Sequence, residues 1–276
     1  MTLLESSVLE TDEREAWPRQ PSPLDHRPRR PLAAKVSGLS KTFGRGQSSV
    51  QAIDSLNLDV ANGEFVCLVG ASGCGKSTLL NLLAGLDAPT SGVVHTEGRV
   101  GLMFQESALF PWLTAAENVA LPLRLAGATK AQRRMRAEEL LASVHLHGQG
   151  DRRPHELSGG MRQRVALARA LAQEADVLLM DEPFGALDAM TRDLLHDELE
   201  QIWLDRRMAV VFVTHNVREA VRLGDRVVVL TSRPGQVAST FDVPFDRPRR
   251  IDSPEVSALA AAITDDLRAE VRRHAG

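Results

Sequence analysis

Short apolar runs alternate with longer amphipathic segments along most of this 276-residue chain. Mostly apolar runs with the length of buried strands occupy residues 65–69, 99–104, 176–180, 209–213 and 227–230. Segments whose pattern is typical of helices occupy residues 78–84, 130–144, 161–171, 189–206 and 254–273. Because buried strands that alternate with helices are typical of a mainly parallel sheet covered by helices, the pattern predicts an α/β fold.

Near the start of the chain, apolar and polar residues alternate with a period of two. Residues 34–39 and 52–60 follow this pattern, which predicts half-buried strands. Asn62-Gly63 comes next, and we expect it to form a hairpin turn that leads into the strand at 65–69. We therefore expect two half-buried strands before the strand at 65–69.

Residues 106–156 interrupt this alternation with a mainly helical pattern. The stretch 115–125 predicts a helix that breaks at Pro122, and 130–144 predicts an amphipathic helix rich in Arg and Glu. We therefore expect a helical insertion between two strands of the sheet. Residues 1–33, by contrast, contain five prolines and a small arginine cluster, and they predict an unstructured tail. The arginines would suit an anionic lipid or a partner, but a solvated tail is the favoured interpretation.

The strand at 65–69 leads into a glycine-rich loop with the pattern Gly, four residues, Gly-Lys-Ser, and a helix follows. Its glycines let the backbone wrap a phosphate, and the helix directs its N-terminal N–H groups at the anion. Lys76 would reach the β- and γ-phosphates of a nucleotide, and the Ser77 hydroxyl would ligate Mg²⁺. The predicted nucleoside triphosphate site consists of Gly70, Ala71, Ser72, Gly73, Cys74, Gly75, Lys76, Ser77 and Thr78.

Polar residues that follow later strands suit phosphate hydrolysis. Asp181 comes directly after a buried strand and suits Mg²⁺ held through water, while Glu182 suits a general base that orients the attacking water. His215 follows the next buried strand, at the edge where parallel α/β sheets bind their ligands. Ser158-Gly159-Gly160 begins a helix, and its bare N–H groups predict a second anion site.

Several positions keep two interpretations. Phe43 precedes a glycine turn and either packs in the core or offers an apolar face to adenine. Gln105 follows the strand 99–104, and a single glutamine at the end of a strand does not by itself indicate a function. Phe110 and Trp112 flank a proline and are either core residues or an exposed docking surface for a partner.

Composition narrows the class of protein. A net charge of −3 gives no basic signal, so nucleic acid is not suggested as a partner. No apolar run approaches the roughly 20 residues that span a bilayer, and the acidic N-terminus lacks the apolar core of a secretory signal. Two cysteines are too few for a disulfide framework or a zinc site and fit a reduced cytosol. We expect a cytosolic protein or one bound to a membrane protein.

Taken in order, the motifs resemble those of the ATP-binding cassette (ABC) ATPases. The glycine-rich loop resembles the family's phosphate loop, and the other motifs resemble its Q-loop (Gln105), signature (Leu157 to Gly160), acidic pair (Asp181-Glu182), D-loop (Leu187-Asp188) and switch histidine (His215). The resemblance implies a P-loop NTPase core, with a mainly parallel sheet flanked by helices, an N-terminal antiparallel β subdomain and an inserted α-helical subdomain at about 106–172. It further implies a tail at 1–33, an ATPase domain at 34–232 and a C-terminal extension at 233–276 that ends in a helix.

The family's mechanism supplies further expectations. Two copies of the chain would pair head to tail, with each ATP held between the phosphate loop of one and Ser158-Gly159-Gly160 of the other. The implied catalytic residues are Glu182, His215, Gln105 and Lys76; the implied additional ATP contacts are Phe43 and Asp188; and the implied Mg²⁺ ligands are Ser77, Gln105 and Asp181. Met161 stands where the family usually has glutamine, but we expect activity to survive because the preceding backbone groups hold the phosphate.

A narrower resemblance concerns residues 109–119, 231–235 and 248–250, which are similar to the nitrate, sulfonate and taurine importer group. It implies two membrane-spanning permease subunits, an indirect solute-binding partner outside the membrane, and a peripheral location on the cytoplasmic face of the cell (inner) membrane. The region of Phe110 and Trp112 would cradle the permease's coupling helix. Within the group we expect aliphatic sulfonates as cargo, with taurine, nitrate or another small solute as alternatives. A soluble ABC ATPase that acts on nucleic acid is a remote alternative, and Glu182 and His215 argue against a binder that does not hydrolyse ATP.

Overall fold

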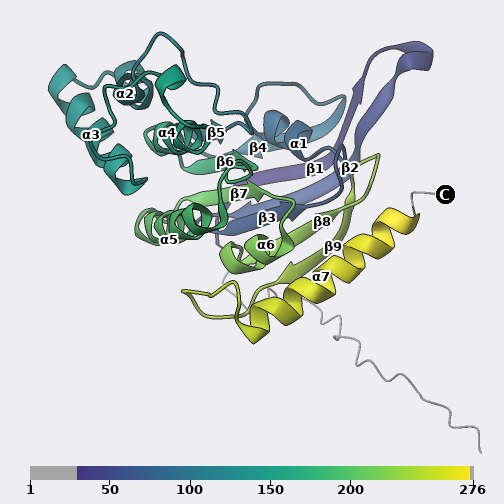
Figure 1. Ribbon diagram of the computed structural model, residues 1–276. Coiled ribbons are helices and arrows are strands. Elements are labelled where there is room, and N and C mark those ends of the chain that lie inside the picture. Colours follow the sequence, from purple (N-terminus) through teal and green to yellow (C-terminus); the bar gives the residue numbers. More distant parts are fainter. Residues whose placement is uncertain (1–29, 274–276) are drawn as a thin grey trace, which may run out of the picture.

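Two β-sheets form the centre of the computed structural model, which describes residues 30–273 (Figure 1). The larger sheet has the strand order β5-β6-β7-β3-β8-β9. These strands are β3 (Phe65–Val69), β5 (Val100–Met103), β6 (Val177–Asp181), β7 (Ala209–Val213), β8 (Arg226–Leu230) and β9 (Val237–Asp242). All neighbours pair in parallel except β9, which runs antiparallel to β8. The predicted α/β fold with a mainly parallel sheet is confirmed. The predicted unstructured tail covers residues 1–33, and residues 1–29 of it lie outside the described part of the chain.

The smaller sheet is antiparallel and has the order β2-β1-β4. Its strands are β1 (Leu32–Phe43), β2 (Val50–Ala61) and β4 (Ser91–Thr96), with the short 3₁₀ helix η2 (Gly46–Ser48) between the first two. The predicted hairpin at Asn62-Gly63 is wrong, because β2 pairs with β1 and β3 pairs with β7 and β8. The turn, in which the Glu64 N–H donates to the Ala61 carbonyl at 3.0 Å, carries the chain from one sheet to the other.

The helices cover both sheets and form a separate lobe. They are α1 (Lys76–Leu83), α2 (Ala115–Leu125), α3 (Lys130–Ser143), α4 (Gly159–Leu171), α5 (Ala189–Arg206), α6 (Val217–Leu223) and α7 (Pro254–Arg273), with the 3₁₀ turn η3 (Pro154–Glu156) before α4. Helices α2 and α3 stand to one side of the sheet and pack on α4, whereas α7 lies along α6 at the opposite end of the molecule (Figure 1).

The central strand β3 shows how the two sides of the sheet are filled. Successive residues of a strand point to opposite faces. Phe65, Cys67 and Val69 therefore join one apolar cluster with the residues of α4 to α7, while Val66 and Leu68 join a second cluster with α1 and the antiparallel sheet. All five are fully buried, which explains why the sequence run is apolar at every position.

Helix α2 is continuous, so the predicted break at Pro122 is wrong. Thr114 and Glu117 form a capping box at its start, and the Ala126 N–H still bonds to the Pro122 carbonyl at 3.0 Å. A proline removes one N–H donor from a helix but leaves its own carbonyl available to the following turn. The well-capped helix therefore continues to Leu125.

The arginines that follow β9 are part of the folded structure. Arg249 is 6% exposed and donates to the main-chain carbonyls of five residues: Val221, Arg222, Gly224, Val243 and Phe245. Arg247 pairs with Glu200 at 2.7 Å and with Asp225 at 2.9 Å, and its guanidinium lies 4.4 Å from the centre of the Trp203 ring. Burial lowers the pKa of Arg249 to about 10, so that the side chain stays charged at neutral pH.

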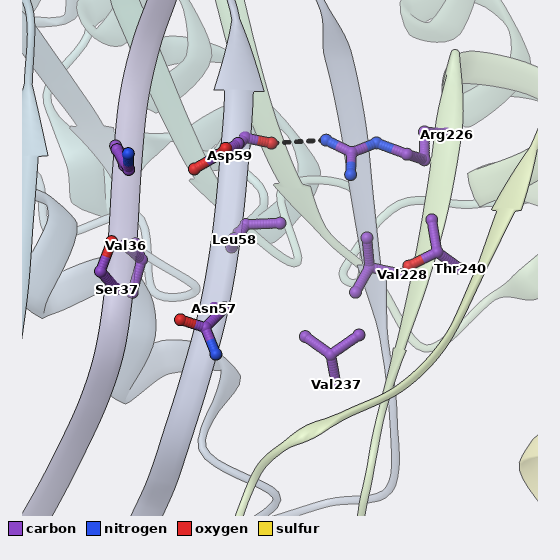
Figure 2. Close-up of a pocket in the computed structure, with 10 residues that line it drawn as sticks. Val36, Ser37, Asn57, Leu58, Asp59, Arg226, Val228, Val237 and Thr240 are labelled. Atoms are coloured by element: carbon purple, nitrogen blue, oxygen red, sulfur yellow. Dashed lines mark hydrogen bonds between the residues drawn. The ribbon is translucent and has the colours of Figure 1, made fainter. Parts of the chain in front are cut away.

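The two sheets meet at Arg226 (Figure 2). Its guanidinium donates to Glu64 at 2.9 Å and to the carbonyl of Asp59 in β2 at 2.6 Å. A cavity of about 360 Å³ lies beside this contact, between β1 and β2 on one side and β8 and β9 on the other. It is separate from the phosphate loop, because none of residues 70–78 lines it.

Within residues 30–273, no helix combines the length and the apolar character needed to cross a bilayer.

Candidate nucleotide-binding site

The glycine-rich loop forms a tight cradle between β3 and α1. Gly73 and Gly75 have φ values of 76° and 96°, which disfavour any residue with a side chain. A Cβ atom at Gly75 would lie 2.8 Å from the Ala52 carbonyl oxygen, so this turn also has no room for one. The Lys76 ammonium donates to the carbonyl oxygens of Gly70 at 2.8 Å and Ala71 at 3.0 Å, and the side chain is thus curled inside the loop. A backbone cradle with a central positive charge fits the phosphates of a nucleotide.

The first turn of α1 faces the end of β6. There the Ser77 hydroxyl interacts with the Asp181 carboxyl closely enough to lower its pKa. Burial raises the pKa of Asp181, the interaction with Ser77 opposes this shift, and the nearby charge of Glu182 adds to it. A hydroxyl and a carboxylate oxygen are the hard ligands that Mg²⁺ prefers, so this pair fits the cation. Thr78 follows in the same helical turn.

Glu182, His215 and Gln105 come together although they lie far apart in the sequence. The Glu182 Oε2 atom is 3.1 Å from Nδ1 of His215 and 3.5 Å from Nε2 of Gln105. Glu182 has a φ of 45°, and its N–H donates to the Val213 carbonyl at the end of β7. A non-glycine residue in this region is uncommon and marks a backbone held by its surroundings, often at a functional site.

Ser158, Gly159 and Gly160 start α4 in the helical lobe. Ser158 is the N-cap residue, and its Oγ accepts a bond from the Met161 N–H at 3.2 Å. This cap uses only the backbone of residue 161, so the methionine is compatible with it. A Cβ atom at Gly160 would lie 3.1 Å from Leu187, which places the motif beside the D-loop. No hydrogen bond found among residues 30–273 joins Ser158, Gly159 or Gly160 to the phosphate loop.

Asp188 caps the following helix. Its Oδ1 atom accepts a bond from the Thr191 N–H at 2.9 Å, and this bond lowers the pKa of Asp188. The predicted ATP contact of Asp188 stays a prediction.

The aromatic residues with two interpretations are not core residues. Phe43 is 45% exposed, and its ring carries the Lys41 ammonium 4.9 Å from its centre. Phe110 and Trp112 are 37% and 67% exposed, and their ring centres lie 5.5 Å apart on the loop before α2. Asn118, fully buried in α2, fixes this loop because its side chain bonds to the backbone of Phe110 and Leu113.

Two residues beside the site were not predicted from the sequence. Gln163 of α4 donates to the Gln105 carbonyl at 3.3 Å and so ties the Q-loop to the helical lobe. Arg233 donates to the Gly73 carbonyl at 3.1 Å and borders the phosphate loop from the β8–β9 connection. The Arg-Pro-Gly turn at 233–235 was visible in the sequence, whereas nothing in the sequence distinguishes Gln163 from the other polar residues of its helix.

The strand–loop–helix cradle, the acidic residues after β6 and the histidine after β7 define a nucleotide-binding protein of the P-loop class. The ABC transporter family model matches residues 53–185. The chain belongs to this family as an ATP-binding subunit, within the nitrate, sulfonate, taurine and bicarbonate group.

Three known proteins illustrate the similarity. The chain is 44% identical to the aliphatic sulfonates import ATP-binding protein SsuB of Bacillus licheniformis, over 82% of this chain and 91% of the relative. It is 51% identical to the taurine import ATP-binding protein TauB of Mesorhizobium japonicum, over 71% and 79%. The dimeric post-hydrolysis structure of the ATP-binding cassette MJ0796, bound to ADP and Pi, matches with a TM-score of 0.72 and 34% identity, over 77% of this chain and 100% of that one.

Proposed function

We propose that this chain is the ATP-hydrolysing subunit of an ABC importer that takes up a small anionic solute, with aliphatic sulfonates as the cargo. One observation carries the hydrolytic part: the Glu182 carboxylate lies within 3.1 Å of His215, after the strand that also presents Asp181 to the phosphate-loop helix. A nucleotide in the cradle would thus have a base and a cation site on the side of its terminal phosphate.

Each side chain of the site has a separate role in the proposed hydrolysis of ATP. Bound Mg²⁺ would neutralise charge on the β- and γ-phosphates, and Ser77, Gln105 and Asp181 supply its oxygen ligands. Lys76 holds the same phosphates as a fixed positive charge. Glu182 accepts the proton of the attacking water, and His215 fixes the carboxylate and reaches the γ-phosphate. Phe43, with an exposed ring, provides the face on which adenine stacks.

A second copy of the chain completes the site. Ser158, Gly159 and Gly160 offer N–H groups at the start of α4, and no hydrogen bond among the described residues ties them to the phosphate loop of their own chain, so they suit the nucleotide of the partner. Asp188 lies beside this motif and would contact the same nucleotide. The dimeric state of the similar cassette MJ0796 supports this arrangement.

The partners in transport follow from the exposed loop before α2. Phe110 and Trp112 form an aromatic pair that faces solvent, and such a pair suits a groove for the permease's coupling helix. Two permease subunits would place the cassette dimer on the cytoplasmic face of the cell (inner) membrane, with a solute-binding protein on the other side. Nucleic acid is not among the proposed partners.

Growth on single nutrients tests the cargo. A strain that lacks the gene is supplied with an alkanesulfonate, taurine or sulfate as sole sulfur source, and separately with nitrate as sole nitrogen source. Loss of growth only on alkanesulfonates is the expected result, with rescue by the unaltered gene and none by a Lys76→Ala copy. Loss on taurine or nitrate alone would replace the cargo and keep the importer. Normal growth on every source would contradict the proposed role in uptake of these solutes.

A further inference from the structure

A buried polar cluster lies directly behind Glu182 and His215. His196 of α5 is fully buried, and its Nε2 atom is 2.7 Å from Oε1 of Glu219 in α6. The other carboxylate oxygen of Glu219 accepts a short hydrogen bond from the hydroxyl of Thr214, the residue before His215. Glu219 is 4% and Thr214 is 2% exposed, so none of the three side chains is solvated.

Polar groups buried at this depth generally need a hydrogen-bond or charge partner. An unpaired carboxylate or imidazole in an apolar core is strongly destabilising, whereas a paired one is tolerated. Thr214 donates from its hydroxyl to Glu219, and a His196 tautomer with its proton on Nε2 donates to the other carboxylate oxygen. Glu219 thereby holds the Thr214 hydroxyl, while Nδ1 of His196 has no hydrogen-bond partner among the described residues and lies 3.7 Å from Oδ1 of Asp193.

Thr214 transmits this constraint to the backbone on both sides of His215. Its hydroxyl oxygen accepts a bond from the Asn216 N–H at 3.0 Å, and its own N–H donates to the Leu68 carbonyl of β3 at 3.2 Å. The Asn216 side chain in turn accepts from the N–H of Glu219 at 3.3 Å. The segment that carries His215 is thus tied to the phosphate-loop strand and to the start of α6.

His196 also contacts the segment that carries Glu182. Its ring lies 5.0 Å from the ring of Phe184, edge to face, and Phe184 is two residues after Glu182. A cavity of about 10 Å³ separates the cluster from the catalytic pair, and Glu182, Thr214, His215 and Glu219 all line it. The buried imidazole of His196 therefore contacts, through Phe184 and Glu219, the segments that carry Glu182 and His215.

We propose that His196 and Glu219 are positioning residues, which hold Glu182 and His215 at the separation that hydrolysis requires. The proposal rests on the function proposed above for that pair. Its physical basis is the sensitivity of catalysis to geometry, because a displacement of about 1 Å in a reacting group costs on the order of 100-fold in rate. Neither residue touches the nucleotide cradle, so the effect belongs in turnover and not in binding.

Two pairs of variants test the proposal. His196→Leu removes the donor to Glu219, and His196→Gln retains an N–H donor. Thr214→Val removes only the hydroxyl, and Thr214→Ser restores it. Leu199→Ala is the matched control, because Leu199 is fully buried on the same helix but belongs to the apolar cluster. Each full-length protein is assayed for kcat, for KM for ATP, and for hydrogen exchange at the amide of Asn216.

We expect His196→Leu and Thr214→Val to lower kcat at least tenfold, to change KM less than twofold, and to speed exchange at Asn216. His196→Gln and Thr214→Ser should recover most of the rate, and Leu199→Ala should lower stability with little change in kcat. The proposal is overturned if folded His196→Leu and Thr214→Val keep the kcat and the Asn216 protection of the unaltered protein. It also fails if Leu199→Ala lowers kcat as much as they do. Absence of ATP hydrolysis in the unaltered protein contradicts the proposed function. In that case, hydrogen exchange at the amide of Asn216 still tests whether the cluster holds the His215 segment in place.

Discussion

At the scale of single residues, Asp181 is a proposed Mg²⁺ ligand whose burial lowers the stability of the fold. Burial holds its pKa above the ordinary 3.8, so the folded protein binds its proton more tightly than the unfolded chain does. The ionised carboxylate therefore destabilises the fold above the raised pKa, and this cost vanishes as the pH falls toward 3.8.

Asp181→Asn is expected to raise the midpoint of thermal unfolding at neutral pH when nucleotide and Mg²⁺ are left out. The gain should shrink as the pH falls through the raised pKa of Asp181 toward 3.8, because Asp181 then takes up its proton in the parent protein. The same variant should lose the further stabilisation that ATP with Mg²⁺ gives to the parent. A variant that is less stable than the parent at neutral pH, or equally stabilised by ATP and Mg²⁺, would contradict this account.

Lys76 supplies the second prediction at this scale. Because its ammonium is the charge at the centre of the phosphate cradle, Lys76→Ala should weaken ATP affinity at least tenfold in a fluorescence titration. Lys130→Ala is a suitable control, since Lys130 is exposed at the start of α3 in the helical lobe, outside the loop. Equal loss in both variants would show that the effect is not specific to the cradle.

Much of the candidate site could be predicted at this scale, because short motifs carry both the chemistry and the local geometry. The loop from Gly70 to Thr78 specifies its own turns through glycine, and Asp181 and His215 follow apolar runs that end at one edge of a parallel sheet. The cluster of His196 and Glu219 could not be predicted in this way. These two residues meet across two helices, and sequence periodicity does not indicate which polar residue of a helix is buried.

At the scale of elements, the predicted helix at 189–206 and strands such as 65–69 have the bounds of α5 and β3. Strong apolar runs and a capping aspartate specify them. Strand β4 was not predicted, because its positions are mostly exposed and lack an alternating pattern. The turn at Asn62-Gly63 shows a further limit: turn residues indicate where the chain reverses but not which strand the next one pairs with.

The segment after β9 gives the prediction for this scale. Arg249→Met leaves five main-chain carbonyls without their charged donor, so the free energy of unfolding should fall by about 3 kcal/mol or more. Urea unfolding measures the change. Arg250→Ala is the control, because Arg250 is exposed and pairs with Asp252 at the surface, and it should change stability little. Similar losses of unfolding free energy in the two variants would contradict the stabilising role given to the Arg249 hydrogen bonds.

At the scale of the whole molecule, docking on a permease is separate from ATP binding. Trp112→Ala should reduce association of the cassette with permease-containing membranes by about 30-fold or more, because a buried tryptophan at an interface contributes about 2 kcal/mol or more. Sedimentation with such membranes measures it. Leu125→Ala, which removes another exposed apolar side chain of the helical lobe, should have little effect. Equal binding by Trp112→Ala and the parent would place the docking surface elsewhere.

The central claim, ATP hydrolysis by this chain with Glu182 as the base, is tested most directly by the turnover of the unaltered protein and of Glu182→Gln. We predict measurable hydrolysis by the former and a loss of at least about 100-fold in the latter, because general base catalysis contributes that much. Glu182→Gln should still bind ATP and should elute as a dimer in its presence. Hydrolysis by Glu182→Gln at the rate of the unaltered protein, or none by the unaltered protein in the presence of Mg²⁺, would contradict the assignment.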